Sequence, residues 1–138
     1  MEFTRRETLA IGAGAALMTV LPFRANASAD DAIAAFTGGA AMADTGVELG
    51  APEIAENGNT VPIDVSAPGA SAILVLAAGN PTPGVATFNF GPLAGDQTAS
   101  TRIRLAGTQD VIAVAKLADG TFARASKTVK VTIGGCGG

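Results

Sequence analysis

The sequence predicts an all-β fold: an immunoglobulin-like antiparallel β-sandwich of about seven strands, with a short N-terminal helix and a flexible glycine-rich C-terminal tail. Apolar and polar residues alternate in segments between residues 47 and 133, and such alternation is typical of strands with one buried face. Turn-forming pairs, such as Asp119-Gly120, separate these segments at roughly the 8–12-residue spacing expected of a sandwich. A small barrel is the alternative architecture.

Residues 1–27 are typical of a twin-arginine-type signal peptide. Arg5 and Arg6 supply the positive start, residues 9–21 are apolar, and an Ala-Asn-Ala triplet then offers small residues for cleavage. The apolar run is too short for a membrane-spanning helix, which needs about 20 residues. We therefore expect export to the periplasm, with residues 28–133 forming the mature β-sandwich and no membrane association. An uncleaved anchor or a disordered leader is the alternative.

A short helix is expected directly after the leader, at residues 28–39. Ile33 and Phe36 lie three positions apart and so share one face, and a glycine pair ends the segment. Asp30 or Asp31 is expected to cap the first turn.

The strands follow in chain order. In residues 60–66, Val61, Ile63 and Val65 are expected to share the inner face, and Pro62 indicates either an edge strand or the start of a strand. The other expected strands are residues 47–49, 71–77, 85–90, 101–105, 111–117, 121–123 and 127–133. The run at 71–77 is apolar almost throughout, which is typical of a central strand.

Two of these strands carry clear inward and outward sets. In residues 101–105, Ile103 is expected inward, whereas Arg102 and Arg104 are expected outward. An exposed arginine pair can bind an anion, although it is more often a solvated or partner-facing surface. Leu105 is expected to face inward with Ile103 in residues 101–105. In the last strand, residues 127–133, the residues expected inward are Val129, Val131 and Ile133.

The composition excludes most catalytic chemistries. The chain has no histidine and one cysteine, so a Cys–His or Ser–His pair cannot form and the usual zinc ligands are missing. The close acidic groups, Asp30-Asp31 and Glu53 with Glu56, are too few for a calcium site. A net charge of −3 without a basic block argues against nucleic-acid binding. We therefore expect a protein that is not an enzyme and that uses neither a metal nor another cofactor.

The single cysteine, Cys136, stands in a tail at residues 134–138 that reads Gly-Gly-Cys-Gly-Gly. Glycine admits conformations closed to other residues, so the tail is expected to be a tether that carries the thiol about 10 Å beyond Ile133. The expected tether residues are Gly134, Gly135, Gly137 and Gly138. No cationic residue adjoins the thiol to activate it, which favours a carrier that reacts in a partner's pocket over a catalyst.

The ending at residues 129–138 resembles the C-terminus of the SoxY family, the sulfur carriers of the bacterial Sox thiosulfate-oxidation system. Residues 52–62, the stretch from Asn80-Pro81 to Phe88, and residues 101–106 resemble the interior of the same family. The resemblance therefore covers nearly the whole mature chain.

The resemblance implies a periplasmic carrier with an immunoglobulin-like fold that forms a heterodimer with SoxZ. Cys136 would be joined oxidatively to thiosulfate by the cytochrome SoxXA, and SoxB would hydrolyse sulfate from the adduct. The sulfur dehydrogenase SoxCD would then oxidise the remaining sulfane sulfur. The tail glycines would let the cysteine enter one active site after another.

Two other functions remain open. A structural or interaction module would use Cys136 for an interchain disulfide, so that a disulfide-linked dimer is its working form. A ubiquitin-like sulfur donor would instead carry a thiocarboxylate on Gly138, although the export signal argues against that class.

Overall fold

The structure is a computed structural model that describes residues 28–134. The signal peptide predicted at residues 1–27 and the tail from residue 135 onward lie outside the described residues. The described part holds the helix α2 (Ala29–Thr37) and nine strands: β1 (Met42–Ala43), β2 (Glu48–Gly50), β3 (Ile54–Ala55), β4 (Val61–Ser66), β5 (Ala70–Ala77), β6 (Gly84–Asn89), β7 (Thr98–Ile103), β8 (Gln109–Leu117) and β9 (Phe122–Val131).

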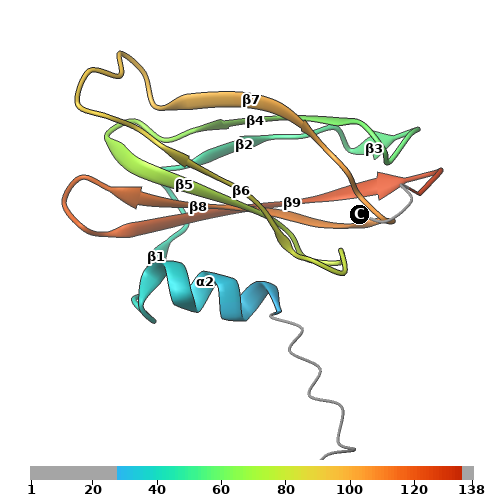
Figure 1. Cartoon of the computed structure of the whole chain (residues 1–138), viewed down its shortest axis with the longest axis horizontal. Helices are drawn as coiled ribbons and strands as arrows, with labels where there is room; N and C mark the ends of the chain where they lie inside the picture. Colours follow the sequence, from blue (N-terminus) through green and yellow to red (C-terminus); the bar gives the residue numbers. More distant parts are fainter. Residues whose placement is uncertain (1–27, 135–138) are drawn as a thin grey trace, which may run out of the picture.

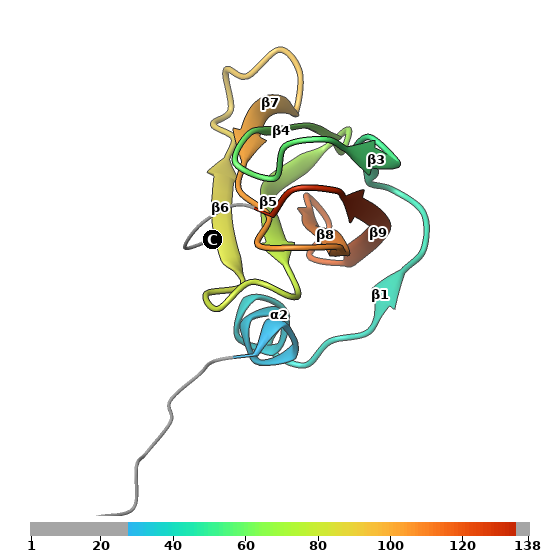
Figure 2. The ribbon, with the colours of Figure 1, turned by 90° about the vertical axis from the view of Figure 1, so that its right-hand side faces the viewer.

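The strands form two facing sheets (Figures 1 and 2). The larger sheet has the order β1-β9-β8-β5-β6, with β3 also paired to β9, and the smaller sheet has the order β2-β4-β7. All pairs are antiparallel except those that β1 and β3 make with β9, which are parallel. The predicted class, an antiparallel β-sandwich with one short helix, is confirmed.

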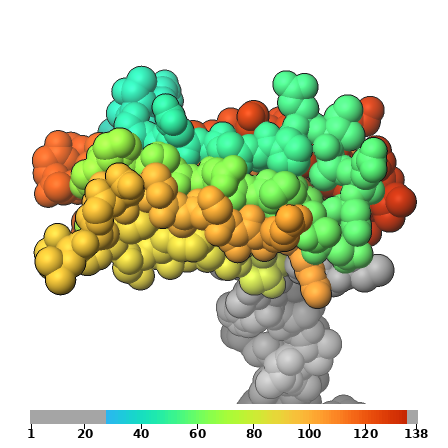
Figure 3. Space-filling view, turned by 90° about the horizontal axis from the view of Figure 1, so that it is seen from above, coloured from blue at the N-terminus to red at the C-terminus, as the bar shows by residue number. Residues whose placement is uncertain are grey.

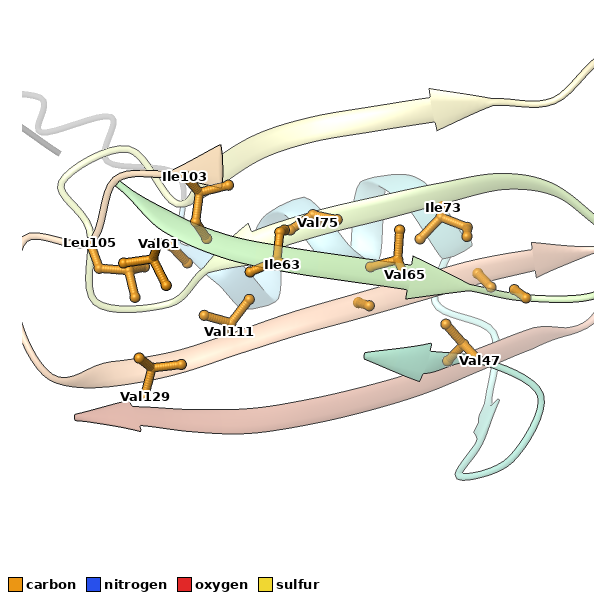
Figure 4. Close-up of a cluster of buried hydrophobic side chains, with 14 of the residues drawn as sticks. Val47, Val61, Ile63, Val65, Ile73, Val75, Ile103, Leu105, Val111 and Val129 are labelled. Carbon is orange, nitrogen blue, oxygen red and sulfur yellow. The ribbon is translucent and has the colours of Figure 1, made fainter. Parts of the chain in front are cut away.

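The core lies between the sheets (Figure 4). Val61, Ile63 and Val65 of β4 point inward with at most 2% of their surface exposed, and Ile73 and Val75 of β5 meet them from the larger sheet. Each side chain of this size stabilises the fold by about 1.5–3 kcal/mol when it is fully buried. The alternation predicted for β4 is therefore confirmed.

A second apolar cluster covers the outer face of the larger sheet. Leu74 and Leu76 of β5 and Phe122 of β9 pack there against Ile33 and Phe36 of α2. The rings of Phe36 and Phe122 meet edge to face, with 5.9 Å between their centroids. Because β5 has the core on one face and α2 on the other, its sequence is apolar almost throughout. β5 is also central, since it pairs with β8 and β6.

The helix cap differs from the prediction. Ser28 is the N-cap, and its hydroxyl accepts a hydrogen bond from the backbone N–H of Asp31 (3.2 Å), whose carboxylate accepts from the N–H of Ser28 (3.1 Å). The prediction that Asp30 or Asp31 is the cap was wrong, because Ser28 and Asp31 form a capping box in which Ser28 is the N-cap and Asp31 is the third residue of the helix. Within residues 28–134, no helix is long and apolar enough to cross a membrane.

Two features of the strands also differ from the prediction. The segments 121–123 and 127–133 belong to one strand, β9, which ends at Val131. Ile133 therefore lies beyond the sheet and is 68% exposed, so the prediction that it faces the core was wrong. Pro62 marks the start of a strand and not an edge: β4 lies between β2 and β7, and β2 pairs only with residues 64–66.

Candidate functional site

The root of the C-terminal tail is the part of the predicted site that the structure describes. Cys136, Gly135, Gly137 and Gly138 lie outside the described residues, whereas Gly134 is the last described residue. The site can therefore be built from the end of β9 outward, at the end of the sandwich where β3 also lies (Figure 1).

One side of the root is held by the segment 55–58. The N–H of Thr132 donates to the carbonyl of Ala55 (3.0 Å), and its hydroxyl donates to the carbonyl of Glu56 (3.0 Å). The buried Gly58 then donates its N–H to the carbonyl of Ile133 at 2.8 Å. These bonds extend the parallel pairing of β3 with β9, so the chain is held up to Ile133.

The other side is held by the loop at residues 104–108. The hydroxyl of Thr108 accepts from the N–H of Val131 at 3.0 Å. Leu105 donates its N–H to the carbonyl of Gly58 at 2.7 Å, which joins this loop to the first segment. The end of β9 is thus held between two loops that are also bonded to each other.

Gly134 lies against the second loop. A Cβ placed on Gly134 would lie 2.5 Å from the carbonyl oxygen of Ala106, a distance that real contacts do not reach. Glycine is therefore required at this position because two backbones approach closely, a reason that is separate from the tether role predicted for it.

A buried polar network supports the second loop from inside. The side chain of Asn80 donates to the carbonyl of Arg104 (2.8 Å) and accepts from the N–H of Ala106 (2.9 Å). The amide of Gln109 donates to the same Asn80 oxygen at 2.8 Å. Asn80 and Gln109 are each 8% exposed, and buried groups bonded in this way hold one conformation because a broken bond leaves a polar atom unpaired.

Gln109 completes the network. Its amide also donates to the carbonyl of Gly107 (3.0 Å), and its oxygen accepts from the N–H of Gly79 (2.9 Å). A Cβ on Gly79 would lie 2.9 Å from the Cβ of Gln109, so this loop also needs glycine. The roles of Asn80 and Gln109 were not predicted from the sequence, because the Gly-Asn-Pro turn around Asn80 indicates a loop but does not indicate which residue bonds to it.

Of the predicted arginine pair, only the carbonyl of Arg104 takes part in this network. The side chains of Arg102 and Arg104 are exposed, as predicted, while Ile103 and Leu105 are buried. Among residues 28–134, no group of three or more His, Cys, Asp or Glu side chains is placed to hold a metal ion.

Figure 3 shows the outer face of the smaller sheet, which is formed by β2, β4 and β7. A shallow depression of ≈ 240 Å³ lies over β2, β4 and β7 and is lined by side chains that include Glu48, Asp64 and Ser100. Asp64 accepts a hydrogen bond from the hydroxyl of Ser100 at 2.5 Å. Two neighbouring depressions share Asp64 with it, and these are lined in part by Lys127 and Arg102 respectively. The face therefore carries charges of both signs, but the described side chains that line it include no cysteine or histidine.

Comparison with known proteins gives a consistent result. The family model described as "Sulfur oxidation protein SoxY" matches residues 33–136, a range that ends on Cys136. The solved structure of the sulfur carrier protein SoxY from Chlorobium limicola f thiosulfatophilum is 40% identical, with a TM-score of 0.66 over 75% of this chain and 96% of that chain. No curated protein matches the chain significantly.

A more distant structure shares the fold alone. The superoxide reductase (neelaredoxin) from Ignicoccus hospitalis is 17% identical, with a TM-score of 0.55 over 63% of this chain and 80% of that chain. Identity at this level indicates a common β-sandwich and says nothing of a shared activity.

Proposed function

The chain belongs to the SoxY family, and from this we propose that it is a periplasmic carrier that holds the intermediates of thiosulfate oxidation covalently on Cys136. The observation that carries the proposal is the family match itself, which extends to the only cysteine of the chain. A role in sulfur oxidation as a carrier follows from family membership. The compartment, the attachment site and the order of steps are the proposed parts.

The proposed chemistry needs one thiol and two partner reactions. In the first, the Cys136 thiol and thiosulfate form an S–S bond, the thiol loses its proton, and two electrons pass to an oxidant, for which a c-type cytochrome such as SoxXA is suited. In the second, water cleaves the sulfane–sulfonate bond, which releases sulfate and two protons and leaves a persulfide on Cys136. A hydrolase such as SoxB fits this step, and a dehydrogenase such as SoxCD would oxidise the persulfide sulfur.

The chain's own residues support the role of a carrier. With no histidine in the chain, no side chain of the usual kind can act as the general base for the thiol. The hydrogen bonds at Thr132 and Ile133 hold the chain that leads to the thiol. The domain would therefore present Cys136 on a tail that starts from a fixed root, and SoxZ is proposed as the heterodimer partner that completes the carrier.

The test is the intact mass of the protein recovered from thiosulfate-oxidising cells. With thiosulfate supplied, we expect a fraction that carries the mass of a bound thiosulfonate or persulfide, located on Cys136 by fragmentation. Cys136→Ser should carry no adduct and should stop turnover while the fold persists. Adding one residue after Gly138 is the matched control, since it would block a thiocarboxylate donor but not a thiol carrier.

Two results would contradict the proposal. One is a protein whose Cys136 stays unmodified while the cells consume thiosulfate. The other is a working form that is a Cys136-linked dimer and loses function on reduction, which would support the alternative of an interchain disulfide module.

A further inference from the structure

The distance between the held part of the chain and the reactive thiol is short. Cys136 follows Ile133 by three residues, and the carbonyl of Ile133 is fixed by the N–H of Gly58. Because an extended residue spans at most about 3.6 Å, the Cα of Cys136 cannot lie more than about 11 Å from the Cα of Ile133. An enzyme that takes Cys136 into a pocket must therefore touch the surface around Ile133.

That surface carries exposed apolar side chains. Among the described residues, the exposed large hydrophobic side chains are Ile54, Leu93 and Ile133. Ile54 is 59% exposed and pairs with Lys130 near the end of β9, whereas Ile133 is 68% exposed beyond that end. Leu93 belongs to the loop between β6 and β7, at the opposite end of the sandwich (Figure 1).

The surface around Ile133 is also fixed in shape. The backbone on one side is bonded to Ile133 through Gly58, and the backbone on the other side is bonded to β9 through Thr108. Asn80 holds the second side from inside. A surface that is already ordered loses little conformational entropy when a partner covers it.

We propose that the surface around the tail root is the docking surface for the enzymes that act on Cys136, with Ile133 as its central contact. This surface comprises Ile54, Asn57, Thr108 and Ile133. The proposal rests on the carrier function proposed above. The occupant is an enzyme with a narrow entrance that admits an extended Gly-Gly-Cys segment and an apolar rim that covers Ile133, so that docking and entry of the thiol occur together.

The experiment compares full-length Ile133→Ser with Leu93→Ser, a matched control at the opposite end. Each protein is incubated with thiosulfate and a fixed extract of thiosulfate-oxidising cells, and intact mass gives the rate at which Cys136 gains an adduct. At limiting carrier, Ile133→Ser should slow this rate about tenfold, as loss of a central interface side chain does. Leu93→Ser should match the wild type.

Two further measurements separate docking from other causes. Iodoacetamide reaches the thiol without docking, so it should alkylate Cys136 equally fast in all three proteins. Ile133→Leu keeps an apolar side chain and should restore most of the adduct rate. Urea unfolding should show the same midpoint for all variants, because Ile133 and Leu93 are both exposed.

The outcomes are distinct. If the wild type is loaded and Ile133→Ser is loaded as fast, or if Ile133→Ser slows alkylation as much as adduct formation, this inference is overturned and the carrier function stands. If the wild type gains no adduct, the carrier function fails, and the inference that rests on it fails too.

Discussion

At the end of the sandwich where β9 stops, buried side chains hold the loops from inside, whereas at the opposite end the loops are closed by exposed turns. At each end, an amide side chain forms hydrogen bonds to the backbone of a loop. Asn80 and Gln109 are each 8% exposed and bond to each other and to four backbone groups. At the other end, the side chain of Gln97 accepts one hydrogen bond, from the N–H of Gly69 to its Oε1 at 3.1 Å. The loops that are held more firmly are therefore those at the end of the sandwich where β9 leads into the tail.

The largest effect is expected from removing the buried amide. Asn80→Ala leaves the carbonyl of Arg104 and the N–H of Ala106 without their partner in a site that water does not reach freely. Each unpaired buried group costs about 1–3 kcal/mol, so we expect the free energy of unfolding to fall by about 2–4 kcal/mol. Urea unfolding measures this change.

The matched variant at the other end is Gln97→Ala. Because its bond to Gly69 is exposed, water can replace the lost partner, and the free energy of unfolding should fall by about 1 kcal/mol or less. Similar losses in the two variants would contradict the claim that the two ends are held differently.

The same contrast explains what could be predicted from the sequence. The strands with alternating residues were predicted because a buried face imposes its period on the chain, as in Val61, Ile63 and Val65. The Asn80–Gln109 bond joins residues 29 positions apart, and the sequence around either residue does not indicate that the two are in contact. The two-residue strands β1 and β3 are too short to show a period.

The reactive residue of the candidate site was predicted from the sequence, but the contacts that hold the tail root were not. Composition identified Cys136 as the candidate reactive residue. The thiosulfate chemistry was predicted from the resemblance to the SoxY family, because composition alone does not indicate a substrate. The support of the tail root was not foreseen, since Thr132 bonds to Glu56 across 76 positions. Contacts over such separations depend on the sheet order, and alternation within a strand does not reveal which strands are neighbours.

A smaller effect is expected from Gly134→Ala. The added methyl group would lie 2.5 Å from the Ala106 carbonyl oxygen, so the end of β9 or the facing loop must shift. We expect the bond from Gly58 to Ile133 to weaken and the free energy of unfolding to fall by about 1 kcal/mol. Hydrogen exchange at the Gly58 amide should become faster.

Gly95→Ala is the control for this variant. Gly95 lies in the loop between β6 and β7, and a Cβ there meets nothing within 4 Å. Replacing such a glycine stabilises a protein by about 0.4–1 kcal/mol, because the unfolded chain loses freedom. Unchanged exchange at Gly58 in Gly134→Ala would show that the close approach to Ala106 does not constrain the tail root.

The smallest effect concerns the turn between β8 and β9, at the end away from the tail. The hydroxyl and the N–H of Thr121 donate to the carboxylate of Asp119 (2.6 and 2.9 Å) and hold its pKa below its ordinary value of 3.8. A carboxyl group whose pKa is lowered on folding stabilises the fold above its unfolded pKa and loses that contribution as the pH falls through its folded pKa. We therefore expect Asp119→Asn to lower Tm slightly at pH 7 and the difference from wild type to shrink below about pH 4.

Thr121→Val is the companion variant, since it removes the stronger donor and keeps the backbone N–H. The double variant should lose less than the sum of the single losses, because both changes break one interaction. A Tm difference that stays constant from pH 7 to pH 3 would mean that the carboxylate charge does not act in this turn. The effect should remain small, because Asp119 is exposed and water competes for its oxygens. The network around Asn80 consists of side-chain amides and backbone groups, which do not titrate in this range, so the stability lost in Asn80→Ala should not vary with pH in this way.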